Sequence, residues 1–500
     1  MAALGLSPEK TPSALFIALW KEAEVWTGPQ RTSARTPAKL FCNKVRKILH
    51  ITQDAEAATD AIRDLLMGNT ARLPPVYRGE VLEVMRAIDE LFYLIHPRAV
   101  LAAPATGVRA PLPRWLKEAR DRRWLEGNFH SDDDHLLIPR GPLLRGARHA
   151  FASSADNLAD RYAALTVTAR RLNQDGRPIT VDLKRIPSSV SRGAPPGLTT
   201  GAEKIAFIPI AEAAEDVTPE TRNTPGQMFV GFKPRDDLDP CAKILNALAE
   251  AGNMDLAIAP EFMVRVEDAE ALAKALSLQP AAPRLIVAGT GSTGEAEDDQ
   301  AWNEARMLNG AGAEVWRQRK LWPAGIDLKR ARRFGIACKG DGVTLFEDNA
   351  AGEILTIADV DGLGRCAILI CQDLKAELLA EQLVIHFQPD WIFVPLPDSG
   401  VGENRWMHAQ AFGLSARAPT RFVMVSSTSL AERAGYKGSA CAMAVGPEAP
   451  DTTMPDKVLS EVPRAFQIAH AETHGEARFA VIQWRQGRWM SSVLAARPSR

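Results

Sequence analysis

The second part of the chain, from residue 202 onward, alternates short apolar runs with amphipathic segments, and this alternation most constrains the fold. A run such as 365–370 is short and almost wholly apolar, as is typical of a buried strand. Strands and helices that alternate so regularly predict an α/β domain with a central sheet. We expect strands at 204–210, 255–259, 284–288, 365–370, 391–394 and 421–426, a hairpin at 306–309 and 314–319, and helices at 239–251, 266–278, 376–388 and 404–416.

The first part of the chain has a different pattern, in which apolar residues recur at helical spacing. These helical segments are 13–26, 38–50, 55–67, 77–95 and 154–172. The sequence that follows is polar and rich in Pro, Gly and Ser, as in a linker or a surface excursion. The predicted organisation is a mainly helical N-terminal region at 1–172, a linker or surface excursion at 173–201 and the α/β domain at 202–500.

Charge and cysteine usage argue against several classes of protein. The net charge is −1 and the sequence pI is about 6.8, so bulk electrostatics give no reason to expect nucleic acid or an acidic membrane as a partner. The six cysteines form no Cys-x-x-Cys pair, which argues against a zinc ribbon and a dithiol redox site. The first residues lack the features of a signal peptide, and no apolar run is long enough to span a bilayer. We therefore expect a reduced, cytoplasmic protein.

Three residues with reactive side chains stand where predicted strands end. Glu261 follows an apolar run and a proline, and Lys320 ends the strand expected at 314–319. Cys371 ends the most apolar strand of the chain and is expected to open a helix. In open α/β sheets, reactive groups collect where strands end and loops begin. These three residues are therefore the catalytic candidates.

Each of these residue types has a chemical reason to be at such a place. A thiol at a strand end and helix N-terminus meets partial positive charge, so we expect a lowered pKa and a thiolate at Cys371. Thiolate attack on a carbonyl or nitrile carbon gives a covalent intermediate. A carboxylate such as Glu261 can take the thiol proton and return it to a leaving amine. The ammonium of Lys320 and the backbone N–H of Gln372 would stabilise the oxyanion, with no metal and no cofactor.

The segments around these residues resemble the three signature blocks of the nitrilase superfamily, the carbon–nitrogen hydrolases. The blocks read DLAIAPE at 255–261, RKLWP at 319–323 and ILICQD at 368–373. They stand in the order found in that family, and the resemblance covers 202–485. The resemblance implies an αββα sandwich, usually dimeric through paired helices. It also implies that Glu261 is the general base, Lys320 the oxyanion stabiliser and Cys371 the nucleophile.

The chain departs from the family's pattern at several positions. Many members carry a second Glu shortly after the Lys, and here the nearest acidic residue is Asp327, which makes it the candidate supporting acid. Gln372 stands where many members have an aromatic residue, and the segment 416–421 lacks the usual Glu. A long excursion at 212–235 is also unusual. Substrate choice is therefore poorly constrained.

Other patterns in the sequence have plainer explanations. The Gly-x-Gly-x-x-Gly run from Gly289 mimics a dinucleotide fingerprint, but acidic residues follow it, so a loop at the rim of the site is preferred. The segment 130–135 is rich in His and Asp but has no second cluster of matching spacing, which favours an acidic loop over a metal site. The basic run 329–333 is more often a solvated loop than a nucleic-acid site, although it could attract an anionic substrate. Cys366 is predicted to be an inert core residue.

The leading functional hypothesis is hydrolysis of a non-peptide carbon–nitrogen bond through a cysteine thioester. Amide cleavage is preferred to nitrile cleavage because it is the commoner activity in such families. A regulatory or binding module in a larger assembly is the alternative from another class, motivated by the N-terminal helices, which are a candidate surface for a protein partner. Acyl transfer to an amine is a third hypothesis, because it shares the acyl-enzyme. The expected partners are a small amide or nitrile and further copies of the chain in a homodimer or higher homo-oligomer.

Overall fold

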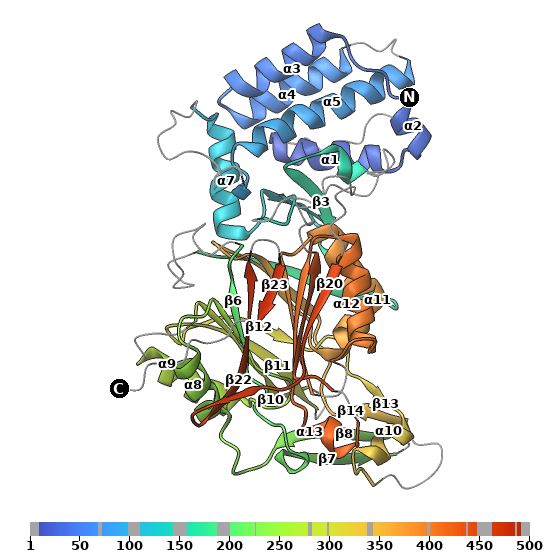
Figure 1. Cartoon of the computed structure of the whole chain (residues 1–500). Coiled ribbons are helices and arrows are strands. Elements are labelled where there is room, and N and C mark those ends of the chain that lie inside the picture. Colours follow the sequence, from blue (N-terminus) through green and yellow to red (C-terminus); the bar gives the residue numbers. More distant parts are fainter. Residues whose placement is uncertain are drawn as a thin grey trace, which may run out of the picture. The chain divides into compact units, whose positions relative to one another are not determined.

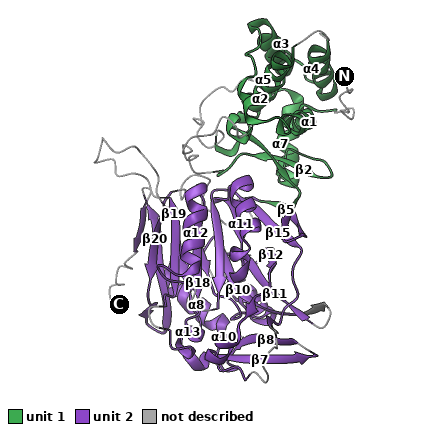
Figure 2. Ribbon diagram, turned by 90° about the vertical axis from the view of Figure 1, so that its right-hand side faces the viewer, with its two compact units in different colours: residues 1–171, 183–185 green, residues 172–182, 186–500 purple. Residues whose placement is uncertain are grey.

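The computed structural model describes residues 10–68, 73–98, 111–143, 158–187, 201–225, 227–278, 283–297, 300–337, 344–397, 401–436, 439–447, 463–485 and 488–491. The chain divides into two compact units (Figure 2). The first comprises residues 1–171 and 183–185, and the second comprises residues 172–182 and 186–500. Among the described residues, no helix is both long and apolar enough to cross a membrane.

The first unit contains α2 (Gly28–Thr32) and α7 (Arg114–Glu126), which were not predicted from the sequence. It also contains the helices predicted between residues 13 and 95, which are α1 (Pro12–Glu24), α3 (Lys39–Ile51), α4 (Ala55–Met67) and α5 (Pro74–Tyr93) (Figure 1). The first of them begins where the side chain of Thr11 accepts a hydrogen bond from the N–H of Ala14, which satisfies an otherwise unpaired amide. Phe16, Trp20 and Phe92 lie in the apolar core between these helices.

One predicted helix of this unit is absent from the described residues. The sequence predicts a helix at 154–172, but residues 158–161 form a short 3-10 turn and β3 (Leu165–Ala169) follows it. This strand pairs with β2 (His135–Pro139), which pairs with β1 (His130–Ser131). The prediction is wrong because the segment carries β-branched residues in succession, which favour an extended backbone.

The second unit contains two large sheets. The strands of the first sheet, in spatial order, are β12 (Glu314–Arg319), β11 (Gln300–Asn309), β10 (Leu285–Glu297), β9 (Leu256–Ile258), β6 (Lys204–Phe207), β22 (Ala477–Arg485) and β21 (Glu472–His474), with β23 (Arg488–Ser491) paired to β22. Those of the second are β20 (Pro463–Ile468), β19 (Ala442–Pro447), β18 (Arg421–Ser426), β17 (Trp391–Leu396), β16 (Gly364–Ile368), β15 (Ile354–Val360), β5 (Arg177–Ile186) and β4 (Arg171–Gln174).

The two sheets face each other and carry helices on their outer faces (Figures 1 and 2). Across the interface, β10 contacts β17 and β12 contacts β15. Helices α8 (Pro240–Ala251) and α9 (Val266–Ser277) pack on the first sheet, and α12 (Trp406–Arg417) packs on the second, near α11 (Glu377–Gln382). Strands β16, β17 and β18 run parallel and are buried along their whole length, as expected of strands covered on both faces. The layers confirm the predicted αββα sandwich.

A smaller sheet lies at one end of this unit. Its strands, in spatial order, are β13 (Gly325–Ile326), β14 (Thr344–Glu347), β8 (Gln227–Pro234) and β7 (Val217–Thr224). The unusual excursion at 212–235 is therefore mostly a β-hairpin. The basic run 329–333, expected to be a solvated loop, instead forms most of a short helix, α10 (Leu328–Arg333), and α13 (Ser429–Arg433) is another short helix of the unit.

The segment 173–201 differs from the predicted linker in its described part. Residues up to Ile186 belong to β4 and β5, at the edge of the second sheet. Within β5, Ile179 and Val181 are buried while the residues beside them are more exposed, which is the period-2 pattern of a strand with one buried face. This alternation is short and lies in a polar segment, so the polar composition led to the wrong prediction of a linker for these residues. Arg177 donates hydrogen bonds to the carbonyls of Leu321 and Gly352, 2.8 and 2.7 Å away.

Candidate active site

Glu261 lies in the turn after β9 and is fully buried. Its backbone N–H donates a hydrogen bond to the carbonyl of Leu396, the last residue of β17, at 3.3 Å. The next residue, Phe262, has a φ of +66°, a left-handed conformation that is uncommon for a residue with a side chain. The chain therefore turns sharply after the carboxylate, where the two facing sheets meet.

The ammonium of Lys320 lies between two carboxylates. Lys320 follows β12, and its backbone N–H donates to the carbonyl of Asn303 at 2.8 Å. Its Nζ donates to Oε1 of Glu261 at 2.8 Å and to Oε1 of Glu347 at 2.6 Å. All three charged side chains are at most 5% exposed. Buried charges of this kind are tolerated only when they are paired and hydrogen-bonded, as they are here.

Cys371 follows β16 with a strained backbone. Its φ is +46°, and such conformations in residues other than glycine persist where the surrounding structure holds them, often at active sites. The side chain is buried, with 6% of the residue exposed. Asp373, two residues after Cys371, accepts the N–H of Leu321, the residue after Lys320, at 3.0 Å, so the turn of Cys371 lies beside the Lys320 loop. The structure therefore brings together the three residues that the sequence analysis selects.

Burial and neighbouring charges set the protonation states in this cluster. Burial raises the pKa of Glu261 to about 7, with Lys320 opposing the rise and Glu347 adding to it. Burial alone would lower the pKa of Lys320, but its two carboxylate partners outweigh burial and raise that pKa above its usual range. Burial also raises the pKa of the Cys371 thiol well above its usual value, and Glu261 raises it further.

The raised pKa of Cys371 corrects an expectation from the sequence. A helix N-terminus after the strand would favour a thiolate. The residues 371–375 instead form a short 3-10 turn, which supplies little aligned dipole. Desolvation and a nearby carboxylate therefore dominate, and the resting group is the neutral thiol.

A buried hydrogen-bond chain orients the carboxylate of Glu261. Thr290 donates from Oγ1 to Oδ1 of Asn303 at 2.5 Å, and Asn303 donates from Nδ2 to Oε1 of Glu261 at 2.8 Å. The same Thr290 oxygen accepts the N–H of Phe262 at 3.2 Å. Oε2 of Glu261 is buried and has no hydrogen-bond partner among the described residues. One carboxylate oxygen is thus fixed, and the other remains available to exchange a proton.

Asp373 connects the turn of Cys371 to the loop after Lys320. Its Oδ1 accepts the N–H groups of Leu321 and Trp322 at 3.0 and 2.7 Å, and its Oδ2 accepts that of Ile370 at 3.0 Å. The side chain is fully buried, and burial raises its pKa to about 7, although Lys320 opposes the rise. Asp373 was not among the site residues predicted from the sequence, although it lies within the third signature block.

The second acid of the cluster is Glu347 and not Asp327. Asp327 lies at the N-cap of α10, where its side chain accepts the N–H of Arg330 at 2.8 Å. Glu347, the last residue of β14, contacts the ammonium of Lys320, and its other oxygen accepts the N–H of Ala324 at 2.7 Å. The assignment of Asp327 is therefore corrected. Asp327 was predicted because it follows Lys320 closely in sequence. Glu347 lies at the end of a strand, which is the sequence signal that identified Glu261 and Cys371.

The backbone N–H of Gln372 is the remaining candidate. It belongs to the residue after Cys371 and lies in the same 3-10 turn. Among the described residues, no hydrogen-bond partner of this N–H is found. An unpaired N–H beside a nucleophile is suited to accept an oxyanion as its partner.

The glycine run from Gly289 has a structural explanation. It lies in β10, paired with β11, and is not the loop that the sequence predicts. A Cβ on Gly289 would lie 2.6 Å from the carbonyl oxygen of Pro260, and one on Gly291 would lie 2.2 Å from that of Val264. These glycines therefore let the strand approach the turn that carries Glu261.

The other patterns do not add to the site. The segment 130–135 forms β1 and its turn to β2, where Asp132 pairs with Lys21 at 2.7 Å. No group of metal-ligating side chains with suitable geometry occurs among the described residues.

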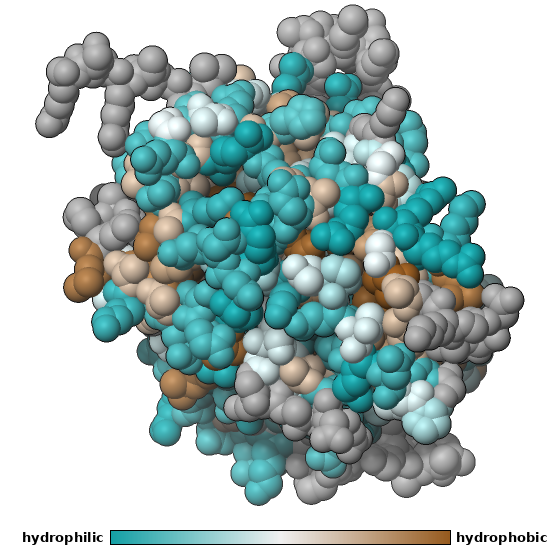
Figure 3. All heavy atoms as spheres, turned by 90° about the horizontal axis from the view of Figure 1, so that it is seen from below, coloured by the Kyte–Doolittle hydropathy of each residue, from teal (hydrophilic) through white to brown (hydrophobic). Residues whose placement is uncertain are grey.

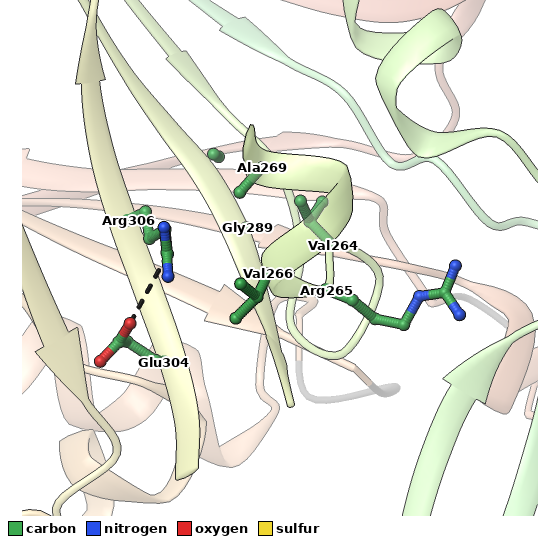
Figure 4. Close-up of a pocket in the computed structure, with 8 residues that line it drawn as sticks. Val264, Arg265, Val266, Ala269, Gly289, Glu304 and Arg306 are labelled. Carbon is green, nitrogen blue, oxygen red and sulfur yellow. Dashed lines mark ion pairs between the residues drawn. The ribbon is translucent and has the colours of Figure 1, made fainter. Parts of the chain in front are cut away.

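A pocket beside α9 is lined by Val264, Glu304 and Arg306, among others (Figure 4). Glu304 and Arg306 form an ion pair at 3.6 Å, and this pocket does not include Cys371.

Comparisons with known proteins return solved structures only. No protein-family model matches the chain, and no curated protein matches it. The chain is similar to Nit3 from Saccharomyces cerevisiae, described as a member of branch 10 of the nitrilase superfamily, with 14% identity and a TM-score of 0.33 over 58% of this chain and 93% of that one. An amidase from Nesterenkonia sp. matches with 15% identity and a TM-score of 0.33 over 54% and 90%. The C. elegans NitFhit protein matches with 13% identity and a TM-score of 0.31 over 54% and 61%.

Proposed function

We propose that this chain hydrolyses a non-peptide carbon–nitrogen bond, in a small amide in preference to a nitrile, through a thioester on Cys371. The observation that carries the proposal is the buried group of Glu261, Lys320 and Glu347 next to a cysteine with a strained backbone. A nucleophile, a base and a cation that lie close together in one buried place supply the parts that acyl transfer requires.

The first step joins thiol deprotonation to attack. Because the pKa of Cys371 is raised, its sulfur carries a proton until substrate is present. The free oxygen of Glu261 takes that proton as Sγ bonds to the carbonyl carbon. A base with a pKa of about 7 is suited to do so near neutral pH. The oxyanion that forms is stabilised by the Nζ of Lys320 and the backbone N–H of Gln372.

The second step releases the amine, and the third hydrolyses the thioester. As the carbonyl reforms and the carbon–nitrogen bond breaks, Glu261 returns its proton to the leaving nitrogen. A water molecule then attacks the thioester carbon while Glu261 takes one of its protons. The thiol leaves with that proton, and a carboxylic acid is released. Glu347 supports each step because it helps to keep Lys320 charged and raises the pKa of Glu261.

Alkylation by iodoacetamide tests the proposal, because the reagent is itself a small amide. Each of the six cysteines is quantified by peptide mass spectrometry after limited labelling at pH 7.5. We expect preferential labelling of Cys371, with Glu261→Gln slowing it and the buried Cys366 serving as the internal control. An amide panel is then assayed for ammonia release, with added hydroxylamine to detect acyl transfer. Equal labelling of Cys371 and Cys366 would refute a catalytic cysteine and favour a binding module.

A further inference from the structure

The two compact units carry opposite formal charges, which the near-neutral total conceals. The sequence of the first unit, residues 1–171 and 183–185, holds 27 Lys and Arg against 19 Asp and Glu. That of the second unit holds 33 Lys and Arg against 42 Asp and Glu. Such a charge asymmetry between parts of one chain is typical of a part that meets an anionic partner. The net charge of −1 therefore gives no reason to exclude an anionic partner of the first unit.

The first unit also carries most of the large apolar side chains that are exposed. Of the thirteen such side chains among the described residues, nine belong to this unit, although it is the smaller of the two. The other four belong to the second unit, and the end of that unit seen in Figure 3 is mostly hydrophilic. Exposed apolar residues that gather in one place mark a surface that binds a partner, whereas scattered ones need no explanation. Their positions in the first unit therefore decide what they imply.

The end of α1 lies beside the beginning of α5. The hydroxyl of Tyr77 donates a hydrogen bond to Oε2 of Glu22 at 3.2 Å. The guanidinium carbon of Arg78 lies 6.0 Å from the ring centroid of Trp26. Both contacts join the last turn of α1 or the residues just after it to the beginning of α5. These two helix ends therefore lie at the same end of the unit.

The beginning of α3 and the end of α4 lie at this end as well. Arg35, four residues before α3, donates its backbone N–H to the carbonyl of Pro75 in the first turn of α5, at 2.9 Å. Helix α3 contacts α4, and only residues 52–54 join the two. Helices joined by so short a connection run antiparallel, so α4 ends where α3 begins. Four helix ends thus come together.

This end of the unit, which we call the tip, combines exposed apolar side chains with cations. Its exposed apolar residues are Val25, Leu40, Met67 and Leu73, with exposed fractions of 79%, 67%, 45% and 62%. Its cations are Arg35 and Lys39, which are exposed, and Arg78, which is half-buried. Among the described residues, none of these three cations forms an ion pair. The tip therefore offers apolar surface and uncompensated positive charge together.

We propose that the tip docks on a phospholipid surface that carries anionic headgroups. Proteins bind such a surface through apolar side chains that enter the interface and through cations that attract anionic lipids. Lys and Arg suit this position because their stems lie along apolar surface while their charged ends stay in water. A nucleic acid would be held through its phosphates and would give the exposed aliphatic side chains no partner. A second copy of the tip would bring like charges together. This inference does not depend on the proposed hydrolysis.

Flotation of the full chain with lipid vesicles tests the cationic part of the tip. One kind of vesicle is phosphatidylcholine alone, and the other is equal parts of phosphatidylcholine and phosphatidylserine. We expect the wild-type protein to bind the second kind more strongly, and raised salt to weaken that binding. Arg35→Gln and Lys39→Gln should each lower the partition constant about fivefold, the effect of one cation near an anionic surface. Glu24→Gln should raise the constant, because it removes an exposed carboxylate from the end of α1.

Leu73→Ser tests the apolar part of the tip without weakening the fold. Leu73 is the N-cap of α5, where serine is favourable, so the helix should persist while the partition constant falls about tenfold. The matched controls are Lys117→Gln and Leu125→Ser, at exposed residues of α7 in the same unit. The N–H of Trp115 in α7 donates to the carbonyl of Gln53, between α3 and α4, so α7 begins at the opposite end of these helices.

The control variants should bind vesicles as the wild type does. Vesicle binding that the tip variants leave unchanged would overturn the inference, as would a wild-type protein that binds neither kind of vesicle. A fluorescent oligonucleotide and light scattering identify the other occupants. Oligonucleotide binding that Lys39→Gln weakens, without vesicle binding, would assign the tip to a nucleic acid instead. A smaller oligomer in Leu73→Ser, again without vesicle binding, would assign it to a second copy of the chain.

Discussion

Replacement of Lys320 by Met is the most direct test of the buried cluster, because one ammonium serves two carboxylates. Its Nζ lies 2.8 Å from Glu261 and 2.6 Å from Glu347, and none of the three side chains is more than 5% exposed. Removal of one partner from a buried ion pair destabilises a protein by about 3–5 kcal/mol, because the other charge stays buried and unpaired. We expect a loss of at least this size in the second unit at pH 8.

The loss of stability in Lys320→Met should grow as the pH rises. Without the ammonium, the pKa of Glu261 rises further in the folded protein, because Lys320 lowers it in the wild type. A carboxyl group whose pKa is higher in the folded than in the unfolded state binds a proton on folding. The stability it contributes is therefore lost as the pH rises above the unfolded pKa of about 4.3. Each such group changes the free energy of unfolding by about 1.4 kcal/mol per pH unit. Lys320→Met should thus be close to wild type at pH 5 and much less stable at pH 8.

Urea unfolding at these two pH values, followed by tryptophan fluorescence, measures the difference. Trp316, on the strand that leads to Lys320, is fully buried and reports on this region. Lys375→Met is the matched control, since Lys375 is an exposed lysine on the turn of Cys371, and it should change stability by at most about 0.5 kcal/mol. Adding Glu347→Gln to Lys320→Met should recover part of the loss. Equal stability of Lys320→Met and wild type at pH 8 would refute the buried cluster.

Three further variants test the roles of the acids. Glu261→Gln should slow labelling of Cys371 by iodoacetamide by about a hundredfold, and the rise of the wild-type rate through pH 7 should disappear with it. Glu347→Gln should move that rise to lower pH, because Glu347 raises the pKa of Glu261; a pH–rate profile that does not move would contradict this. Asp373→Asn should cost about 1–3 kcal/mol in urea unfolding, since an amide cannot accept all three N–H groups.

The sequence located the reactive residues because strand ends are visible in it. Glu261 and Cys371 each follow a short apolar run, and such runs in an α/β domain become buried strands whose ends meet. Glu347 shares this property, but it lies 27 residues beyond Lys320. Sequence proximity favoured Asp327 instead. What brings Glu347 to the ammonium is the pairing of β14 with β13, the short strand that follows Lys320, and no local pattern encodes this contact.

Two other features depended on tertiary structure in the same way. The described part of 173–201 pairs with β15 at the edge of a sheet, and the partner strand decides this more than the polar composition does. The protonation state of Cys371 depended on burial and on carboxylates that arrive from distant strands. The helix dipole is a local argument, and desolvation outweighed it.

The charges of the cluster explain why a cysteine with a raised pKa suits the proposed chemistry. The ammonium of Lys320 already pairs with the carboxylates of Glu261 and Glu347. A free thiolate at Cys371 would therefore add a third negative charge to a buried site in which these two carboxylates share one cation. Transfer of the thiol proton to Glu261 avoids this, because the carboxyl group becomes neutral as the sulfur becomes negative and the total charge does not change. The negative charge then moves to the substrate oxygen, towards Lys320 and the N–H of Gln372. Activation is thereby tied to the presence of a carbon that accepts the sulfur, and the same proton is at hand for the leaving nitrogen.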